Sequence, residues 1–152
     1  MKKFSLWAVL SLLAAFFAQA EPKIALGIGP EWNMNSRRNF AGGLSASLDC
    51  KIAPDFAAGA VFTASHNFNG FTAIEPRALL RWYFLKSGGE GFFAQAEAGA
   101  FIFFEDGETT VMPLGGLRGG YRKPLGTFYI EPYGRLGYPF AFGVGILAGV
   151  RL

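Results

Sequence analysis

The sequence has little of the chemistry on which most small protein sites depend. It contains one cysteine, Cys50, and one histidine, His66. A disulfide framework needs paired cysteines and a Cys/His zinc site needs several such ligands, so both are excluded. Charged residues are 16% of the chain, against about 25% in an ordinary soluble domain. No Gly-Lys-Ser/Thr phosphate loop occurs, so we expect neither a cofactor nor a metal.

Charge also argues against nucleic acid as a partner. The formal net charge is +3, but Lys2 and Lys3 lie in a segment that we expect to be removed. The rest of the chain has 12 basic and 11 acidic residues, which is too even for a phosphate-binding surface. Apolar residues are 51% of the chain and aromatic residues 16%, so the chain has too much apolar surface to stay disordered.

The N-terminus has the pattern of an export signal. Lys2 and Lys3 precede an apolar run from residue 6 to residue 18, and a small-x-small site follows at Ala18-Gln19-Ala20. This is typical of a secretory signal peptide, and a retained N-terminal anchor is the alternative. We expect cleavage after Ala20, a signal peptide over residues 1–20, and one domain over residues 21–152.

After Ala20 no apolar stretch is long enough for a membrane-spanning helix. Apolar residues instead recur at every second position, as from residue 39 to 52 and at the even positions from Phe140 to Leu152. Strict alternation predicts β-strands with two unlike faces. Turn-forming residues separate eight such segments, roughly 23–32, 39–52, 56–66, 71–86, 92–104, 110–122, 127–137 and 140–152. The short connections predict antiparallel neighbours, and the segment lengths suit a tilted transmembrane strand.

The polar face of these segments predicts a charged lumen. A soluble barrel with its apolar face inside is the competing interpretation, but this chain has too few charges to cover an outer surface. Charges of both signs in a narrow interior pair with one another. If residues 123–126 close a simple hairpin, Arg118 falls opposite Glu131. The expected lumen ion network is Glu75, Arg77, Arg81, Glu97, Arg118, Arg122, Glu131, Arg135 and Arg151.

Aromatic residues, glycines and prolines refine this prediction. Aromatic residues of the apolar face, Phe140 among them, gather near the two sets of strand ends, as interface girdles do. Glycines on the polar face leave room for Arg and Tyr side chains inside a narrow barrel. Pro76, Pro113 and Pro132 fall inside the expected strands, where a closed barrel has no free edge for them; local bulges are one explanation.

The mature chain resembles the small eight-stranded outer-membrane barrels of the OmpA-transmembrane-domain, OmpX and OmpW type. The strand from Phe142 to Leu152, apolar at alternate positions, is similar to the signal that the outer-membrane insertion machinery recognises, although Leu152 stands where Phe is usual. The stretch from Tyr129 to Phe140 is also similar to small barrels of spirochaetes. The resemblance implies an all-β, eight-stranded antiparallel up-and-down transmembrane β-barrel in the outer membrane, in contact with its lipid. It implies little about activity.

We expect a structural or interaction protein rather than an enzyme. Lipid A deacylases of this size use a His and a Ser two residues later, but Phe68 follows His66 at that spacing, and Ser65 points to the opposite face. A narrow pore for small solutes, a surface adhesin and a lipid-modifying enzyme remain alternatives. On the outward face, a stripe of small residues is a possible docking surface for a second copy or another barrel. The stripe comprises Ala94, Ala96, Ala98 and Ala100.

Overall fold

Alternating residues build most of the described part of the chain into strands. The computed structural model describes residues 24–35, 40–67, 71–84, 89–105 and 107–152, so the expected export signal and its cleavage site lie outside the described residues. The strands are β1 (Ile24–Asn35), β2 (Phe40–Ala53), β3 (Phe56–His66), β4 (Thr72–Phe84), β5 (Gly91–Glu105), β6 (Glu108–Leu125), β7 (Phe128–Tyr138) and β8 (Phe140–Arg151).

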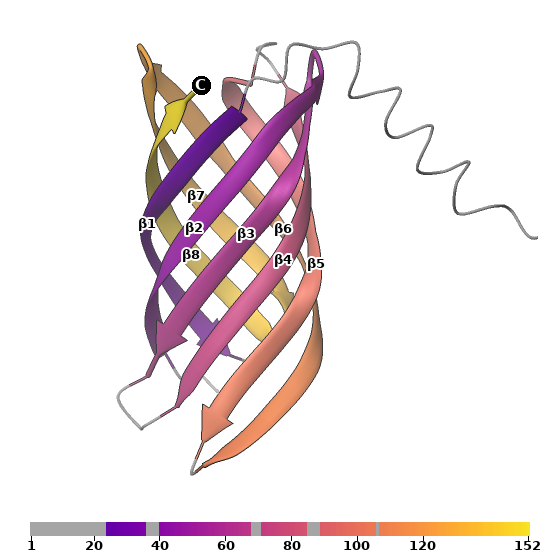
Figure 1. Cartoon of the computed structure of the whole chain (residues 1–152), viewed down its shortest axis with the longest axis vertical. Helices are drawn as coiled ribbons and strands as arrows, with labels where there is room; N and C mark the ends of the chain where they lie inside the picture. The colour runs from indigo at the N-terminus through magenta and orange to yellow at the C-terminus, as the bar shows by residue number, and fades with distance from the viewer. Residues whose placement is uncertain (1–23, 36–39, 68–70, 85–88, 106) are drawn as a thin grey trace, which may run out of the picture.

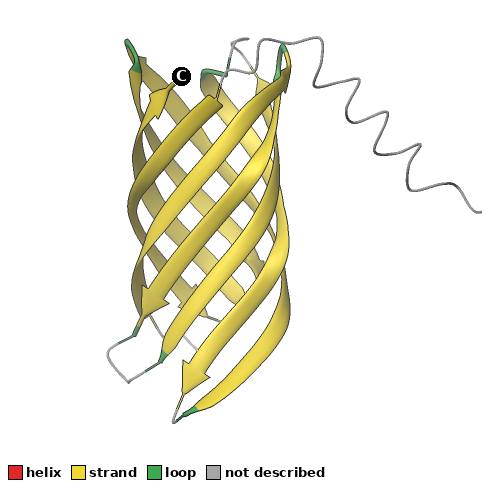
Figure 2. Cartoon of the chain, in the orientation of Figure 1, coloured by secondary structure: helices red, strands yellow, loops and turns green. Residues whose placement is uncertain are grey.

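The eight strands close into a barrel. Each strand pairs antiparallel with the next, and β8 pairs with β1 (Figures 1 and 2). This confirms the predicted all-β, eight-stranded, antiparallel up-and-down barrel. Closure leaves the strands without an edge along most of their length, so their backbone groups are satisfied within the sheet. Within the described residues, no helix is long and apolar enough to span a membrane.

The two ends of the barrel differ. β1, β3, β5 and β7 run from the upper to the lower end in Figure 1, and β2, β4, β6 and β8 run back, so the C-terminus lies at the upper end. The β5–β6 hairpin projects beyond the lower rim. Gly115 is the first residue of β6 that has a partner in β7, where it pairs with Tyr138. The part of β6 before Gly115 therefore pairs with β5 alone.

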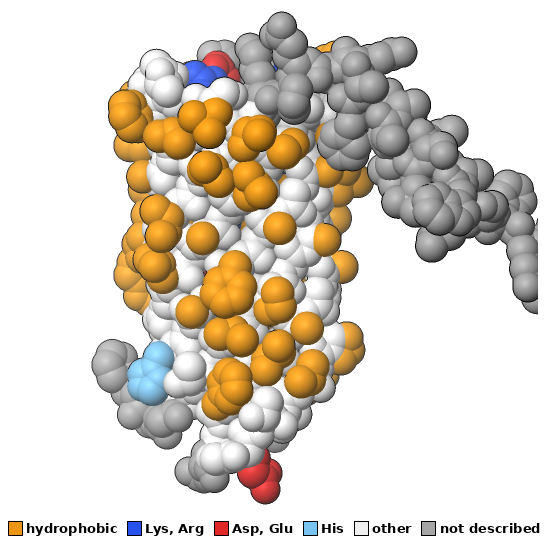
Figure 3. Space-filling view, viewed as in Figure 1, with side chains coloured by type: hydrophobic (Ala, Val, Ile, Leu, Met, Phe, Trp, Pro, Cys, Tyr) orange, Lys and Arg blue, Asp and Glu red, His pale blue; other side chains and the backbone are white. Residues whose placement is uncertain are grey.

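Side chains alternate between a polar interior and an apolar exterior. In β4, Glu75, Arg77 and Arg81 are buried while Leu80 and Trp82 are exposed. The same parity holds along the other strands, and apolar side chains are spread over the outer face in Figure 3. The sequence assigned these faces correctly because a strand has a side-chain period of two.

Phe140 departs from this assignment. The alternation of β8 placed Phe140 outside, but its side chain is 5% exposed and lies 3.5 Å from the guanidinium carbon of Arg135. The pairing of β8 with β1 shifts register between Met34 and Asn35, and such a shift reverses the facing of the residues beyond it. The expected position of Phe140 in an outer aromatic girdle is therefore wrong.

Where a proline lies inside a strand, the strand is paired at that position with only one of its two neighbours. Pro76 pairs with Phe62 of β3, but it has no partner in β5. Pro132 likewise pairs with Ile146 of β8 and has no partner in β6. Because proline has no N–H, one side of the strand loses its hydrogen bond while the other side stays paired. Pro113 pairs with β5 and lies beyond the rim of β7, where no second neighbour is needed.

Glycines provide the space for large inward side chains. Tyr129 lies directly opposite Gly149, and Tyr133 lies opposite Gly145. A Cβ added at either glycine would collide with the ring of its tyrosine. The expected role of the inward glycines therefore has a direct geometric basis here, because the rings lie flat over positions that have no side chain.

Candidate functional site: the charged lumen

The lumen is filled with charged side chains from six strands. Five carboxylates and five guanidinium groups lie inside the barrel, and none of these residues is more than 5% exposed. Burial of so many charges is tolerated only where each is paired and hydrogen-bonded. The ten residues are Glu31, Asp49, Glu75, Glu97, Glu131, Arg77, Arg81, Arg118, Arg122 and Arg135.

An upper cluster of two acids and two arginines surrounds Glu131. Arg81 donates to both carboxylate oxygens of Glu131, at 2.8 and 2.9 Å. Arg122 donates from Nε to Glu131 at 2.6 Å and from Nη2 to Asp49 at 2.7 Å. Charges of opposite sign are equal in number in this cluster, so it carries no net charge.

A lower cluster of three acids and three arginines follows. Arg135 donates to Glu31 and, at 2.8 Å, to Glu75. Arg77 donates to Glu97 at 2.8 Å, and Arg118 places Nε 2.8 Å from the same carboxylate. Arg118 also lies 3.4 Å from Glu31. This cluster is balanced as well, so the buried network as a whole is electrically neutral.

Neutral polar groups link the clusters. Gln95 accepts a hydrogen bond from Arg81 at 2.7 Å and donates to Glu97 at 2.5 Å, so the upper and lower clusters form one network. Tyr133 donates its hydroxyl to Glu31 at 2.7 Å. These hydrogen bonds hold the carboxylates of Glu97 and Glu31 in one orientation. Their oxygens then bind the arginines without a further loss of side-chain conformational entropy.

Aromatic rings cover the faces of the guanidinium groups. The guanidinium carbon of Arg81 lies 4.1 Å from the ring centre of Phe93, and that of Arg118 lies 3.9 Å from Tyr133. Arg122 lies 4.2 Å from the ring centre of Tyr129. Planar cations bond carboxylates at their edges and pack on rings with their faces, so these residues fill the barrel in cross-section.

The structure brings together eight of the nine residues expected in the lumen network and separates the ninth. Arg151 lies at the upper mouth, where it donates to Glu90 and, at 2.6 Å, to the carbonyl oxygen of Gly126. Glu31 and Asp49 are members that the sequence analysis did not select. Their signal was present, since both stand at odd positions on the polar face of their strands.

The predicted pairing of Arg118 with Glu131 is wrong. Arg118 lies opposite Arg135, and Glu131 is bound by Arg81 and Arg122. The strand β6 continues to Leu125, which pairs with Phe128, so the turn consists of Gly126 and Thr127 rather than residues 123–126. Gly126 has a positive φ of 70°, which suits a two-residue hairpin turn. Because β6 is longer than predicted, the register between β6 and β7 differs from the prediction by four residues. Arg118 and Glu131 both still face inward, as predicted.

The docking stripe lies on the outside of β5. Ala94, Ala96 and Ala98 are exposed and Ala100 is partly exposed. Ala98 pairs with Gly115 of β6 and Ala94 pairs with Gly119; both glycines face outward, and Gly115 has open space beside it. The small-residue surface thus extends onto β6, where Leu117 projects between the glycines.

The catalytic alternative finds little support around His66. Ser65 is buried on the inward face, whereas His66 is exposed on the outward face. Nδ1 of His66 lies 2.9 Å from the hydroxyl oxygen of Thr72, and no acidic side chain among the described residues orients the ring. Nor do the described residues bring three or more His, Cys, Asp or Glu together in a way that could hold a metal ion.

Comparison with solved structures places this geometry among membrane barrels. Neisserial surface protein A superposes with a TM-score of 0.60 at 12% identity, over 88% of this chain and 97% of that one. The N-terminal barrel domain of Pseudomonas aeruginosa OprF gives 0.56 at 12% identity, over 87% and 100%. A de novo designed transmembrane β-barrel gives 0.55 at 12% identity, over 87% and 98%.

The chain has the fold of a small eight-stranded transmembrane β-barrel. This confirms the resemblance to small outer-membrane barrels at the level of the fold. At 12% identity the likeness carries no activity from these proteins to this one. No family model matches the chain, and no curated protein matches it.

Proposed function

We propose that the chain is an integral outer-membrane protein with a structural or interaction role, that its outer face contacts lipid, and that its lumen is closed. Among the described strand residues, Lys123 near the upper end is the one charged residue of the outward parity. An outer face so poor in charge is suited to hydrocarbon and not to water. Contact with outer-membrane lipid follows from this face.

Aromatic side chains near both rims support membrane insertion. Such belts at the two interfaces are typical of membrane barrels. Ala, Leu, Ile and Val occupy most of the outward positions between them. The upper belt comprises Phe56, Trp82, Phe84, Phe92, Tyr121 and Phe128, and the lower belt comprises Trp32, Phe40, Phe104, Tyr138 and Phe142.

The observation that carries the proposal of a closed lumen is the neutral network of ten buried charges. Eight strands enclose only enough space for packed side chains, and here arginines and aromatic rings occupy it in successive layers. An ion crossing the barrel would have to break several charge-assisted hydrogen bonds at once, so the network acts as a plug.

The strand β8 supports a role for the insertion machinery in assembly. Outward apolar residues alternate from Phe142 to Val150, which agrees with the sequence signal expected for recognition. Transport through the barrel, adhesion and lipid modification have weaker support: the lumen is filled, the connections are short, and His66 lacks an orienting acid among the described residues.

Planar-bilayer conductance of the refolded mature chain tests closure. The wild type should give no stable conductance steps. Replacing Arg81 and Glu131 together with Ala keeps the charge balance, removes the centre of the upper cluster, and should produce steps. This variant controls for insertion, since it differs from the wild type only inside the barrel. Stable steps from the wild type would instead establish the narrow pore.

A further inference from the structure

The two mouths of the lumen have different linings. At the lower end, the Phe71 ring stacks on Phe101 and Phe103, with centroid separations of 6.0 and 5.3 Å, and Phe140 covers Arg135. At the upper end, a cavity of about 580 Å³ leads from the rim down to Asp49 and Arg122. Ligand pockets commonly measure about 300–1,000 Å³, so this cavity has the size of a binding site.

Small inward residues produce the cavity. Ala25 pairs with Asp49, and Ala57 pairs with Arg81; both alanines are buried and line the hollow. Arginine or tyrosine occupies the corresponding space deeper in the barrel. The floor consists of Arg122 with its two hydrogen bonds to Asp49, and the Tyr83 side chain forms part of the wall. The walls are therefore fixed by the same network that fills the lumen.

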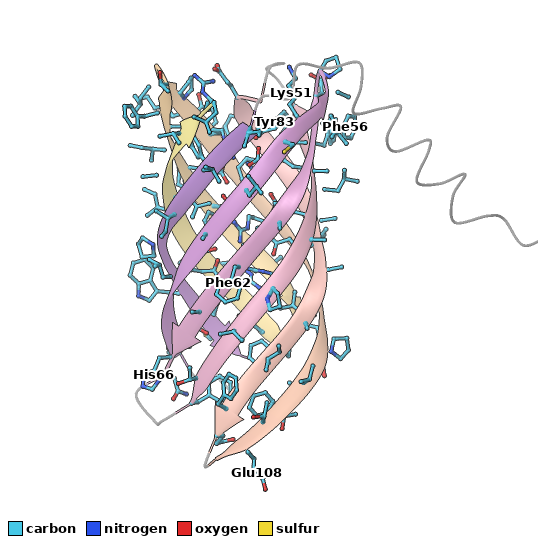
Figure 4. The ribbon with its side chains drawn as sticks, in the orientation of Figure 1. Lys51, Phe56, Phe62, His66, Tyr83 and Glu108 are labelled. Atoms are coloured by element: carbon cyan, nitrogen blue, oxygen red, sulfur yellow. The ribbon has the colours of Figure 1, made fainter. Side chains whose placement is uncertain are left out.

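Lys51 brings a cation to this cavity. It follows Asp49 by two residues on the inward face of β2 and lines the hollow near the rim. Figure 4 shows Lys51 and Tyr83 near the upper end of the barrel. Asp49 is paired with Arg122, and Glu90 is paired with Arg151. Among the described residues, Lys51 has no hydrogen-bond or ion-pair partner, so its ammonium group is available to an external anion.

We propose that this cavity binds a small molecule with a single carboxylate, which pairs with Lys51 while its body occupies the hollow above Tyr83 and Ala57. A cation held in a concave site with fixed walls favours an anion over the water that it displaces. The carboxylate belongs either to a free organic acid or to the C-terminus of a short peptide. This site goes beyond the proposed function, which assigns no ligand, and it requires only the folded barrel.

Lysine methyl resonances test the proposal directly. The mature chain has four lysines, Lys23, Lys51, Lys86 and Lys123, and reductive methylation with a ¹³C label keeps their charge. The chain is refolded in detergent, and heat-dependent gel mobility establishes folding before titration, so a failure to fold is distinguished from a failure to bind. Lys51→Met identifies the Lys51 resonance. N-acetyl-dialanine and propionate represent the two sources of the carboxylate, and N-acetyl-dialanine amide is the matched neutral probe.

The Lys51 resonance should move saturably with at least one carboxylate and not with the amide, while the Lys123 resonance on the outer face stays in place. Binding of propionate identifies a free acid as sufficient, and binding of the peptide alone identifies a peptide C-terminus. By calorimetry Lys51→Met should weaken binding at least tenfold, and Lys123→Met should leave it unchanged. Equal binding of acid and amide, no saturable shift with either acid, or full affinity in Lys51→Met would overturn the proposal.

Discussion

Glu131 shows what a buried charge requires in this lumen. Its two oxygens accept hydrogen bonds from Arg81 and Arg122, and the residue is fully buried. Its inward position was predictable from alternation, but its partners were not. Facing depends only on the period of the strand, whereas pairing depends on where the β6–β7 turn begins and on which distant strands meet across the barrel.

Removing the Glu131 carboxylate should therefore be costly. In Glu131→Ala, Arg81 and Arg122 lose a shared partner in a buried site, and the free energy of unfolding should fall by about 3–5 kcal/mol. Glu90→Ala breaks the ion pair with Arg151 at the partly exposed mouth and should cost about 0–1 kcal/mol. Urea unfolding in lipid vesicles measures both. Equal losses would contradict the closed network.

The inward glycines give a second test at the residue scale. A Cβ at Gly149 would collide with the carbonyl of Leu26 and the ring of Tyr129, so Gly149→Ala should lower the free energy of unfolding by about 1–3 kcal/mol through overpacking. Gly115 faces outward with open space, and Gly115→Ala should change it by within about 0.5 kcal/mol. The same unfolding assay compares the two, and a tolerated Gly149→Ala would show that the tyrosine packing is looser than described.

At the scale of elements, the end of β6 and the facing of the first residue of β8 differ from the sequence prediction. The sequence located eight segments because each alternates over enough residues to be unambiguous. It ended β6 too early, since Lys123 and Pro124 resemble turn residues although both pair with β7. It also placed Phe140 outside, because the register shift against β1 leaves no mark in the alternation of β8. The boundary of a strand and the position of a bulge depend on pairing with the neighbouring strand. The alternation within one segment carries no information about that pairing.

The outer face of β5 and β6 carries the docking hypothesis. Ala96 and Ala98 on β5, with Gly115 and Gly119 on β6, form a low surface beside Leu117, which is 66% exposed. In lipid, association relies on close packing of small residues because burial from water is not available. Docking of this surface to a second copy or to another barrel stays a prediction.

Replacing Ala96 and Ala98 with Leu tests docking. The double variant keeps the face apolar and should insert normally, but the added side chains fill the low surface. Cross-linking in native membranes should lose an oligomer or heterocomplex band present for the wild type. Ala148→Leu on β8 is the control, since it adds the same group to an exposed alanine three strands away from β5. Absence of a band in the wild type, or its persistence in the double variant, would leave the stripe as ordinary lipid-facing surface.

At the scale of the whole molecule, two opposite requirements are met by one alternating pattern. The outward face is apolar and nearly free of charge, and the inward face holds ten charges that balance one another. A soluble barrel needs the reverse arrangement, with charge outside and apolar groups inside. The composition predicted this division, because 16% charged residues can fill a narrow interior but cannot cover an exterior.

Quenching of tryptophan fluorescence by brominated lipids tests this central claim most directly. The mature chain has two tryptophans, Trp32 and Trp82, which are 53% and 50% exposed on the outer face. After refolding into vesicles, each single-tryptophan variant, Trp32→Phe or Trp82→Phe, should be quenched by lipids brominated near the headgroups more strongly than by lipids brominated near the bilayer centre. Quenching by aqueous iodide, with none by any brominated lipid, would place the apolar face in water and contradict the account.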